Sequence, residues 1–269
     1  MSIHPTAIVE DGAILGAGAE IGPFSLVRAG AKLGDGVKLH SHVVIEGRTE
    51  IGANTIVYPQ AVLGGAGQIR GGDATGTKLI IGANCEIREA VTISAGSKKG
   101  GGVTRVGDNC YFMAYSHAGH DAQIGNNVTI ANGAQIAGHA EIGDGVIFGG
   151  LAAVQQFARV GKFAFISGLS GVSTDVIPYA IAIGLHVRIG GLNIIGLRRR
   201  KVPHANIHAM RAAFRYIFLE GRRAKDAALD AAAQWADVPE VRDITDFILA
   251  KPNRPICPAR THADGDGED

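Results

Sequence analysis

Residues that could do chemistry lie eighteen positions apart in the middle of the chain. His120-Asp121 is followed eighteen positions later by Gly138-His139, and Gln156 lies eighteen positions beyond Gly138. A histidine held by a neighbouring carboxylate is a general base suited to neutral pH, because the unperturbed imidazole pKa is about 6.5. A backbone N–H at Gly138 would stabilise a developing oxyanion. No serine or cysteine nucleophile with a partnered side chain is apparent, so these residues predict direct attack by a deprotonated substrate hydroxyl.

These residues form one site only if the fold stacks them. In a repeat of eighteen residues per coil, with coils about 4.8 Å apart, His120, the Gly138 amide, His139 and Gln156 would gather on one outer patch, with His120 pointing outward. His117 stays open between substrate contact and packing. A zinc site is the alternative, because His117, His120 and His139 are all potential ligands. The first two are only three positions apart and a third ligand is missing unless His139 serves, so we expect no metal.

A six-residue period supplies the elements that would position this site. Large apolar residues recur at every sixth position from Ile3 to Leu63 and again from Val106 to Val172, with Ala118 as the small exception. Each is followed four positions later by a small or short residue, and Gly, Asp and Asn cluster between the repeats. This period fits neither an α-helix nor a simple strand, so it describes a short extended stretch with a tight turn, and such units bury a core only by stacking. The sequence predicts an all-β solenoid, specifically a parallel β-helix of hexapeptide repeats.

The β-helix is predicted over residues 1–190, with two interruptions. Residues 64–78 lose the pattern and form either a degenerate coil or a projecting loop, whereas residues 95–105 shift the register and form an inserted loop. A small helical domain is predicted over residues 191–250, capping the open end of the stack; its helices are expected from Pro203, over 224–236 and over 238–250. The last stretch, 251–269, is predicted to be a disordered tail.

Composition narrows the function classes. The 269 residues carry a formal net charge of +1, which argues against a general nucleic-acid binder. No apolar run approaches the roughly 20 residues of a membrane span, and the repeat begins at once, leaving no room for a cleavable signal. Cys85 and Cys110 fall on small inward positions and are expected to be buried core residues. We therefore expect a cytoplasmic protein without a disulfide framework or a cofactor.

The hexads resemble those of the hexapeptide-repeat acyltransferases, whose β-helix is left-handed with eighteen residues per coil. Linked segments narrow the resemblance to the acyl-carrier-protein-dependent UDP-N-acetylglucosamine acyltransferases that begin lipid A synthesis, and it spans nearly the whole chain. These segments include Ile3-His4-Pro5-Thr6, Ile87-Arg88-Glu89, His117-Ala118-Gly119-His120-Asp121, Ala137-Gly138-His139, Gln156-Phe157 and Gly196-Leu197-Arg198-Arg199.

The resemblance implies a role for each residue. His120 would be the general base toward the sugar 3-hydroxyl, Asp121 would orient it, and the Gly138 amide would form the oxyanion hole. The donor would be an (R)-3-hydroxyacyl chain on acyl carrier protein, and the family works as a homotrimer with sites between subunits. The remaining residues would bind the sugar (Gln68, His117, His139, Gln156), the nucleotide (Asn193, Arg199, Arg200) and the end of the acyl chain (Gly168).

Several departures from the family pattern fall on the acceptor side. The first loop reads Gln68-Ile69-Arg70-Gly71 where the family usually has Gln-Asp-Leu-Lys, and Ser94, Gln155 and Ile195 replace two histidines and an acid. The acceptor is therefore either UDP-N-acetylglucosamine or a 3-amino analogue, which would give an amide. An acetyl-CoA-dependent acetyltransferase and a scaffold with a decayed site are the remaining alternatives. Basic residues at the helical end would attract an acidic carrier protein; they are Arg198, Arg199, Arg200, Lys201, Arg211, Arg215, Arg222 and Arg223.

Overall fold

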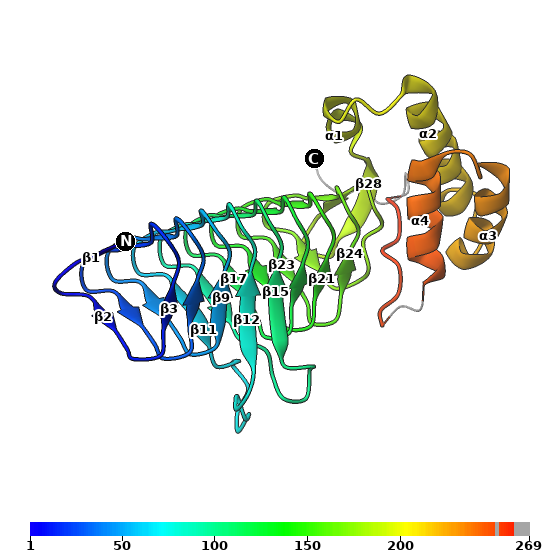
Figure 1. Ribbon diagram of the computed structural model, residues 1–269. Coiled ribbons are helices and arrows are strands. Elements are labelled where there is room, and N and C mark those ends of the chain that lie inside the picture. Colours follow the sequence, from blue (N-terminus) through cyan, green and yellow to red (C-terminus); the bar gives the residue numbers. More distant parts are fainter. Residues whose placement is uncertain (251–252, 261–269) are drawn as a thin grey trace.

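A computed structural model describes residues 1–250 and 253–260. The chain winds through short strands that stack into three sheets, which form the sides of a long prism (Figure 1). Sheet A contains β1 (Ser2–Ile3), β4 (Glu20–Ile21), β7 (Lys38–Leu39), β10 (Ile56–Val57), β13 (Glu86–Ile87), β16 (Tyr111–Phe112), β19 (Thr129–Ile130), β22 (Ile147–Phe148), β25 (Phe165–Ile166), β27 (Ala180–Ile183) and β28 (Arg188–Leu192).

Sheets B and C complete each coil. Sheet B contains β2 (Ile8–Val9), β5 (Leu26–Val27), β8 (Val44–Ile45), β11 (Val62–Gly65), β14 (Thr92–Ser94), β17 (His117–Ala118), β20 (Gln135–Ile136), β23 (Ala153–Val154) and β26 (Gly171–Val172). Sheet C contains β3 (Ile14–Leu15), β6 (Lys32–Leu33), β9 (Thr49–Ile51), β12 (Lys78–Ile81), β15 (Val103–Val106), β18 (Gln123–Ile124), β21 (Glu141–Ile142) and β24 (Arg159–Val160). The chain visits A, B and C in turn, which confirms the predicted parallel β-helix.

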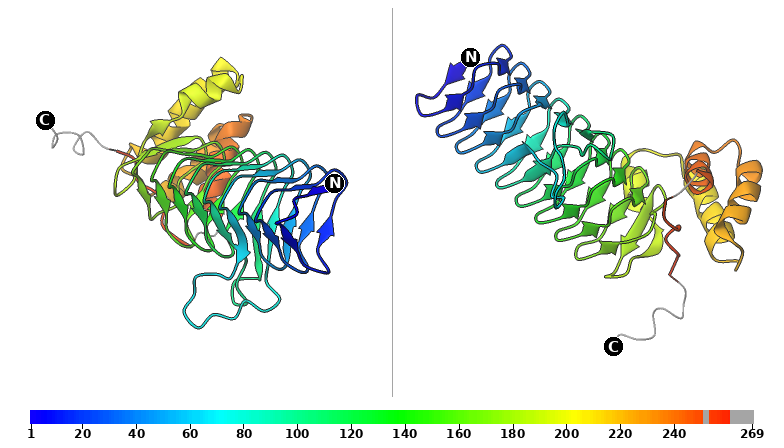
Figure 2. Two further views of the ribbon diagram at one scale, coloured as in Figure 1. Left: turned by 90° about the vertical axis from the view of Figure 1, so that its left-hand side faces the viewer. Right: turned by 90° about the horizontal axis from the view of Figure 1, so that it is seen from below.

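The register gives the length of a coil. Ser2 pairs with Glu20, and Thr129 pairs with Ile147, so an uninterrupted coil takes eighteen residues. Two coils are longer, because Ile56 pairs with Glu86 and Glu86 with Tyr111. The extra residues form two loops, 66–77 and 95–102, which project side by side from the β-helix (Figures 1 and 2). The first interruption is therefore a projecting loop and not a degenerate coil.

The hexad side chains fill the interior of the prism. Ile45, Leu63, Phe112 and Ile136 are fully buried, and the small residues four positions after the large ones are buried beside them. Cys85 and Cys110 lie in this core as predicted. The first coil is the exception: Ile3 is 43% exposed and Ala7, Val9, Ala13 and Leu15 are only partly buried, because no coil precedes it to cover them.

The C-terminal end of the β-helix, unlike the first coil, is followed by an antiparallel strand pair and by helices. β27 and β28 form the antiparallel pair of sheet A, and four helices follow: α1 (Ile194–Arg199), α2 (His204–Phe218), α3 (Ala224–Gln234) and α4 (Pro239–Leu249). The three predicted helices are confirmed, while α1 was not anticipated. Among the described residues, no helix combines the length and apolarity that crossing a bilayer requires.

The prediction of a disordered tail is wrong for residues 253–260. Ile256 forms a β-bridge with Asp175 and Ala259 forms one with Ile189, while the Cys257 side chain is fully buried. The reason is that the last coil leaves backbone groups that this segment pairs with, which a composition rich in proline does not reveal. The rest of the predicted tail, 251–252 and 261–269, lies outside the described residues.

Candidate active site

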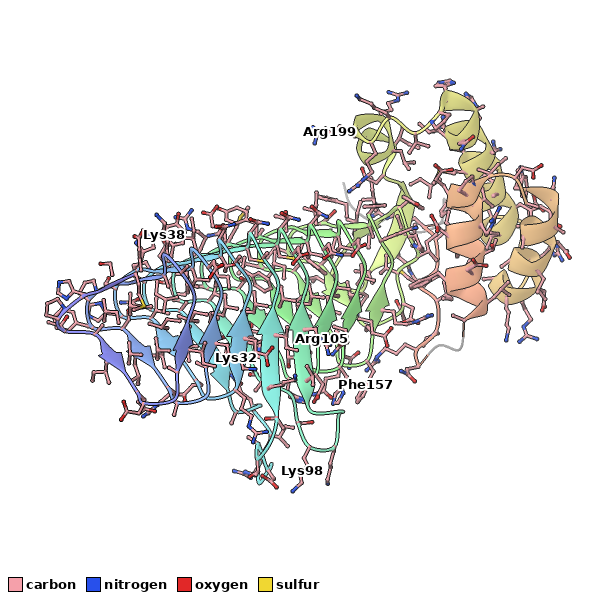
Figure 3. The ribbon with its side chains drawn as sticks, in the orientation of Figure 1. Lys32, Lys38, Lys98, Arg105, Phe157 and Arg199 are labelled. Carbon is pink, nitrogen blue, oxygen red and sulfur yellow. The ribbon has the colours of Figure 1, made fainter. Side chains whose placement is uncertain are left out.

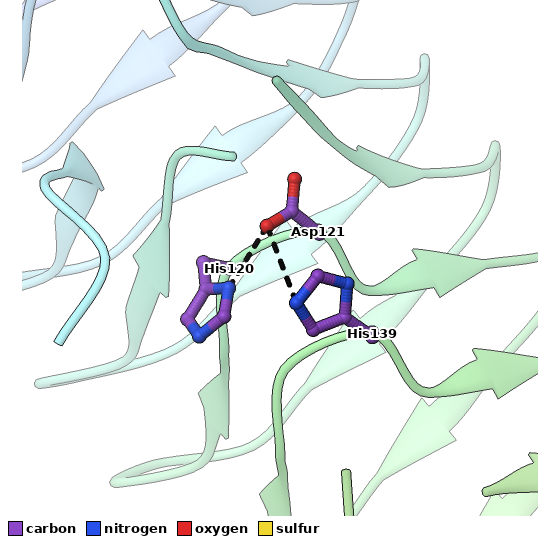
Figure 4. Close-up of side chains that lie close together, drawn as sticks. All are labelled: His120, Asp121 and His139. Carbon is purple, nitrogen blue, oxygen red and sulfur yellow. Dashed lines mark hydrogen bonds and ion pairs between the residues drawn. The ribbon is translucent and has the colours of Figure 1, made fainter. Parts of the chain in front are cut away.

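His120 and Asp121 lie at the turn between β17 and β18, where the chain passes from sheet B to sheet C. His120 Nδ1 is 2.8 Å from Asp121 Oδ2 (Figure 4). An ionised carboxylate only accepts hydrogen bonds, so Nδ1 carries the proton and Nε2 is left as the acceptor. The predicted carboxylate-oriented imidazole is therefore present in the geometry that a general base requires.

Ser97, from the second projecting loop, holds the Asp121 carboxylate. Its backbone N–H donates to both carboxylate oxygens at 2.9 Å, and its hydroxyl donates to Oδ2. Burial works to raise the pKa of Asp121, but the hydrogen bonds from Ser97 and His120 outweigh it and lower the pKa of this carboxyl below its usual value. Asp121 therefore stays ionised while buried.

The two projecting loops cover this turn, so the predicted outer patch is shielded from solvent. His120 points out of the prism but is only 8% exposed. A Cβ placed on Gly67 would lie 2.8 Å from His120 Cβ, and one on Gly100 would lie 2.4 Å from His139 Cε1. The loops thus pack directly on the imidazoles, and glycine at these two positions permits the close approach.

Gly138 lies one coil beyond His120. A Cβ on Gly138 would fall 2.7 Å from His120 Nε2, which places this backbone against the basic nitrogen. Within residues 1–250 and 253–260 the Gly138 N–H has no hydrogen-bond partner. A donor of this kind, beside a base, is suited to an oxyanion.

His139 stands next to His120 on the neighbouring coil. The two rings meet edge to face with centroids 4.9 Å apart, and His139 stacks on Phe157 at 4.5 Å. Its Nε2 lies 3.8 Å from Asp121 Oδ2. Burial lowers the pKa of His139 below the usual value, although Asp121 opposes this. The His139 ring is therefore a neutral hydrogen-bonding group at neutral pH.

A pocket of about 360 Å³ opens beside these groups. Five of the predicted residues line it, namely Gln68, His117, His120, Gly138 and Gln156, together with Ser94. His117 Nδ1 is 2.7 Å from the Thr92 hydroxyl, and burial lowers the pKa of His117. This imidazole lines the pocket while bonded to its neighbouring strand, so it both packs and faces the space where a substrate would lie.

Asn193, Arg199 and Arg200 line a second pocket, of about 410 Å³, against sheet A. Asn193 caps α1 by accepting the Gly196 N–H at 2.9 Å. The Arg200 guanidinium lies 3.4 Å from the centre of the Phe163 ring, and burial lowers its pKa. Figure 3 places Arg199 and Phe157 on opposite sides of the β-helix. Within one chain, these three residues are therefore not brought to His120.

Gly168 lines neither pocket and lies at the turn between sheets A and B. A Cβ there would come within 3.2 Å of the Gly150 carbonyl oxygen. Three large apolar side chains are exposed along the same edge: Tyr115 at 70%, Leu151 at 64% and Leu169 at 64%. Gly168 thus borders an apolar edge that this single chain leaves uncovered.

The one potential metal cluster among the described residues coincides with the His120–Asp121 turn. Ligand atoms of His120, Asp121 and His139 lie within 4.8 Å of one another. The Asp121 oxygens already accept hydrogen bonds from Ser97 and His120, which favours an orienting role. The absence of a metal stays a prediction.

Sequence reasoning missed the residues that hold the site from the loops and the chain end. Ser97 and Gly67 lie in insertions, where the hexad register is lost and no spacing connects them to His120. Arg254, which contacts Gln155 and Gln156, lies in the segment expected to be disordered. Thr92 was detectable, because it precedes His117 by one coil once the second insertion is subtracted.

Comparisons with known proteins agree with this architecture. Residues 175–257 match the family described as "Udp N-acetylglucosamine O-acyltransferase; Domain 2", and residues 30–65, 104–138 and 122–156 match "Bacterial transferase hexapeptide (six repeats)". The acyl-[acyl-carrier-protein]–UDP-N-acetylglucosamine O-acyltransferase of Bartonella henselae is 45% identical over 262 residues, covering 97% of this chain and 96% of that protein. The protein of the same name from Sinorhizobium fredii is 44% identical over 254 residues, covering 94% of each.

A solved structure shows the same shape. The UDP-N-acetylglucosamine acyltransferase from Campylobacter jejuni superposes with a TM-score of 0.90 at 36% identity, covering 96% of this chain and all of that one. Since the likeness in sequence and in structure spans almost the entire length, the chain belongs to the UDP-N-acetylglucosamine O-acyltransferase family.

Proposed function

We propose that this chain transfers an (R)-3-hydroxyacyl group from acyl carrier protein to the 3-hydroxyl of UDP-N-acetylglucosamine, the first step of lipid A synthesis. The observation that carries the proposal is the His120–Asp121 pair beside the Gly138 N–H, which has no partner in the described part of this family member. We further propose that the β-helix is left-handed, as in its relatives.

The chemistry follows from these groups. His120 Nε2 takes the proton of the sugar 3-hydroxyl as its oxygen attacks the thioester carbonyl carbon. The Gly138 N–H donates to the resulting oxyanion. When the tetrahedral intermediate collapses, the C–S bond breaks and the protonated His120 returns its proton to the departing thiolate. The products are the sugar ester and the free thiol of the carrier, and Asp121 stays ionised throughout.

Three residues that line the pocket, together with His139 next to His120, would position the acceptor. Gln68, His117, His139 and Gln156 present amide and neutral imidazole groups, which hydrogen-bond a sugar without adding charge. Asn193 uses its carbonyl oxygen to cap α1, so its NH₂ group is the part free for the nucleotide. Arg199 and Arg200 would hold the diphosphate.

A homotrimer would unite the two pockets. One chain separates Arg199 from Phe157 across the prism (Figure 3), and Phe157 stacks on the His139 ring that adjoins His120. A neighbour packed side by side can bring its own sheet A to this turn. The exposed apolar edge of Tyr115, Leu151 and Leu169 would be covered in such an assembly. Gly168, on the same edge, would leave room for the end of the acyl chain.

Turnover of defined substrates tests the proposal. Purified protein is incubated with (R)-3-hydroxyacyl carrier protein and UDP-N-acetylglucosamine, and the product is identified by mass spectrometry. We expect the sugar ester, and a loss of turnover of at least about 100-fold in His120→Ala. An unchanged rate in His120→Ala would leave the scaffold alternative; acylation from acetyl-CoA in place of the carrier thioester would favour the acetyltransferase.

A 3-amino sugar nucleotide is the second candidate acceptor. Ser94, one of the departures from the family pattern, lines the pocket beside Gln68, so the acceptor contacts are where this chain differs. The same assay with the 3-amino analogue decides between the two. Turnover of the hydroxyl sugar alone would exclude amide formation.

The exposed face of α2 would receive the carrier protein. Arg211 and Arg215 are exposed on it, one turn apart, next to His204 and His208. Acyl carrier proteins are acidic, so opposite charge would speed their encounter. We expect Arg211→Glu/Arg215→Glu to raise the KM for the carrier thioester and to reduce its dependence on salt. Lys32→Glu/Lys38→Glu, the same charge change at the far end of the β-helix (Figure 3), is the control.

A further inference from the structure

The end of the described chain contacts the wall of the active-site pocket. Residues 253–260 run along the last coil, where Asp175 N–H donates to the Pro255 carbonyl at 2.9 Å and Cys257 N–H donates to the Asp175 carbonyl at 2.8 Å. This places Arg254 beside the turn that contains Gln155 and Gln156. The segment is therefore a built part of the fold at this point.

Arg254 makes three hydrogen bonds there. Its Nε donates to the Gln156 carbonyl at 2.7 Å, and its Nη1 donates to Gln155 Oε1 at 3.1 Å and to the Ser173 carbonyl at 3.2 Å. Among the described residues, no carboxylate pairs with Arg254. The guanidinium is thus used to bind neutral oxygens of the turn and not to form an ion pair.

These contacts complete a column of hydrogen-bonded peptides that leads to His120. At this edge of the prism, the His139 N–H donates to the His120 carbonyl at 3.0 Å, and the Phe157 N–H donates to the Gly138 carbonyl at 3.3 Å. The next donor along the column would be Asp175, but its N–H is taken by Pro255. The Gln156 carbonyl therefore loses its donor from the following coil, and Arg254 supplies one instead.

We propose that Arg254 is a positioning residue of the acceptor pocket, which fixes the Gln156 peptide and, through it, the turn that carries Gly138. This proposal rests on the proposed function, in which Gln156 contacts the sugar. Because Gln156 lines the pocket and its own carbonyl is held by Arg254, a rotation of this peptide would move the side chain that faces the acceptor. Hydrogen-bonded peptides also polarise one another, so the end of a column affects its other members.

Arg254→Ala tests the proposal, with Arg260→Ala as the matched control. Arg260 lies in the same segment and is exposed, and its bond to the β-helix, from its backbone N–H to the Ile189 carbonyl, does not involve the side chain. We expect Arg254→Ala to raise the KM for UDP-N-acetylglucosamine about tenfold, with a smaller change in kcat and an unchanged KM for the carrier thioester. Arg254→Lys, which can keep at most part of the contacts, should fall between. A general loss of structure would instead change both KM values.

Hydrogen exchange gives a readout that does not need turnover. Amides of residues 155–157 and 139 should exchange faster in Arg254→Ala than in the wild type and in Arg260→Ala. A wild type without turnover would overturn the proposed function, while this exchange pattern would still support the proposal that Arg254 fixes the Gln156 peptide. If Arg254→Ala does not fold, Gln155→Leu removes the side-chain contact alone and should raise the acceptor KM in the same direction. An acceptor KM equal to that of Arg260→Ala, or equal to the wild type in Gln155→Leu, would overturn the proposal.

Discussion

Two turns of the same coil share a backbone conformation but differ in whether a side chain of the next coil accepts a hydrogen bond from the turn. At the turn from sheet C to sheet A, a backbone N–H of each coil donates to a side-chain oxygen at the same turn of the next coil. Ala83 N–H donates to Asp108, Asp108 N–H to Asn126 and Asn126 N–H to Asp144, at 2.7 to 2.9 Å. At the turn from sheet B to sheet C the equivalent positions are His120, Gly138 and Gln156, and the Gly138 N–H keeps no partner among the described residues. Omitting the cap leaves this N–H available, and the turn is distinguished by the His120 imidazole that lies beside it.

The second turn position shows the same contrast. These residues adopt positive φ at both turns: 56° for Asn127 and 64° for Gly145, against 59° for His139 and 64° for Phe157. Asn and Gly adopt this region readily, whereas larger side chains do so at a cost of about 1–3 kcal/mol each. The stacking of His139 on Phe157 helps to offset that cost. In this pair of coils the B-to-C turn therefore carries the costlier residues, although Phe163 adopts a φ of 61° at the next turn from sheet C to sheet A.

Gln156→Asp should convert the catalytic turn into the capped kind. An aspartate there can accept the Gly138 N–H as Asp144 accepts that of Asn126, which removes the oxyanion donor. We expect kcat to fall about 10²–10³-fold, while the free energy of unfolding rises by about 1 kcal/mol.

Gln156→Ala is the control for this change, because it removes the proposed sugar contact but leaves the amide free. The kcat difference between the two variants isolates the cap. Equal kcat values would mean that the Gly138 N–H does not stabilise the transition state.

Gly138→Ala tests the comparison by adding to the B-to-C turn the Cβ that the C-to-A turn already has. Asn126 and Asp144 show that this turn position accepts a Cβ, so the backbone tolerates the change. The methyl group would lie 2.7 Å from His120 Nε2 and displace the imidazole. Steady-state kinetics should show a loss of about 100-fold in kcat, with thermal unfolding close to that of the wild type. A fully active variant would contradict the proposed role of His120 as the general base.

The fold was predictable because one inward residue per hexad is a local requirement that repeats. The alignment of His120, Gly138 and Gln156 needs only the coil length, which the family resemblance supplied. The two loops could not be predicted in this way, because Ser97 reaches Asp121 and Gly67 reaches His120 across insertions whose conformation no period describes. The prediction of a disordered tail failed for another reason. The partner of Ile256 is Asp175, about eighty residues away, and composition alone does not detect such pairing.

The division of the predicted site residues between two pockets could not be predicted from the sequence for a different reason. Asn193, Arg199 and Arg200 have residue types suited to a nucleotide, and the resemblance assigned them to it. In a single chain they line a different pocket from His120, and neither sequence periodicity nor the geometry of one chain brings them closer. Their role depends on an assembly, for which the exposed edge at Leu151 and Leu169 is the physical argument.

Ser97→Ala tests how much the loops contribute to the turn that they cover. The variant loses the hydroxyl bond to Asp121 and keeps the backbone N–H bonds, so we expect a fall of about fivefold in kcat, corresponding to about 1 kcal/mol. The pKa of Asp121 should rise toward its usual value, because a donor to the ionised form is removed. A lowered native-state pKa gives stability that is present above the unfolded-state pKa of about 3.9 and is lost as the pH falls toward the native-state pKa, so the variant should lose less stability than the wild type on acidification below about pH 5. Ser116→Ala is the matched control: its buried hydroxyl has no partner among the described residues, and its removal should leave both the kinetics and the pH dependence of unfolding unchanged. If the two alanine variants behave alike, the loop covers Asp121 without holding it.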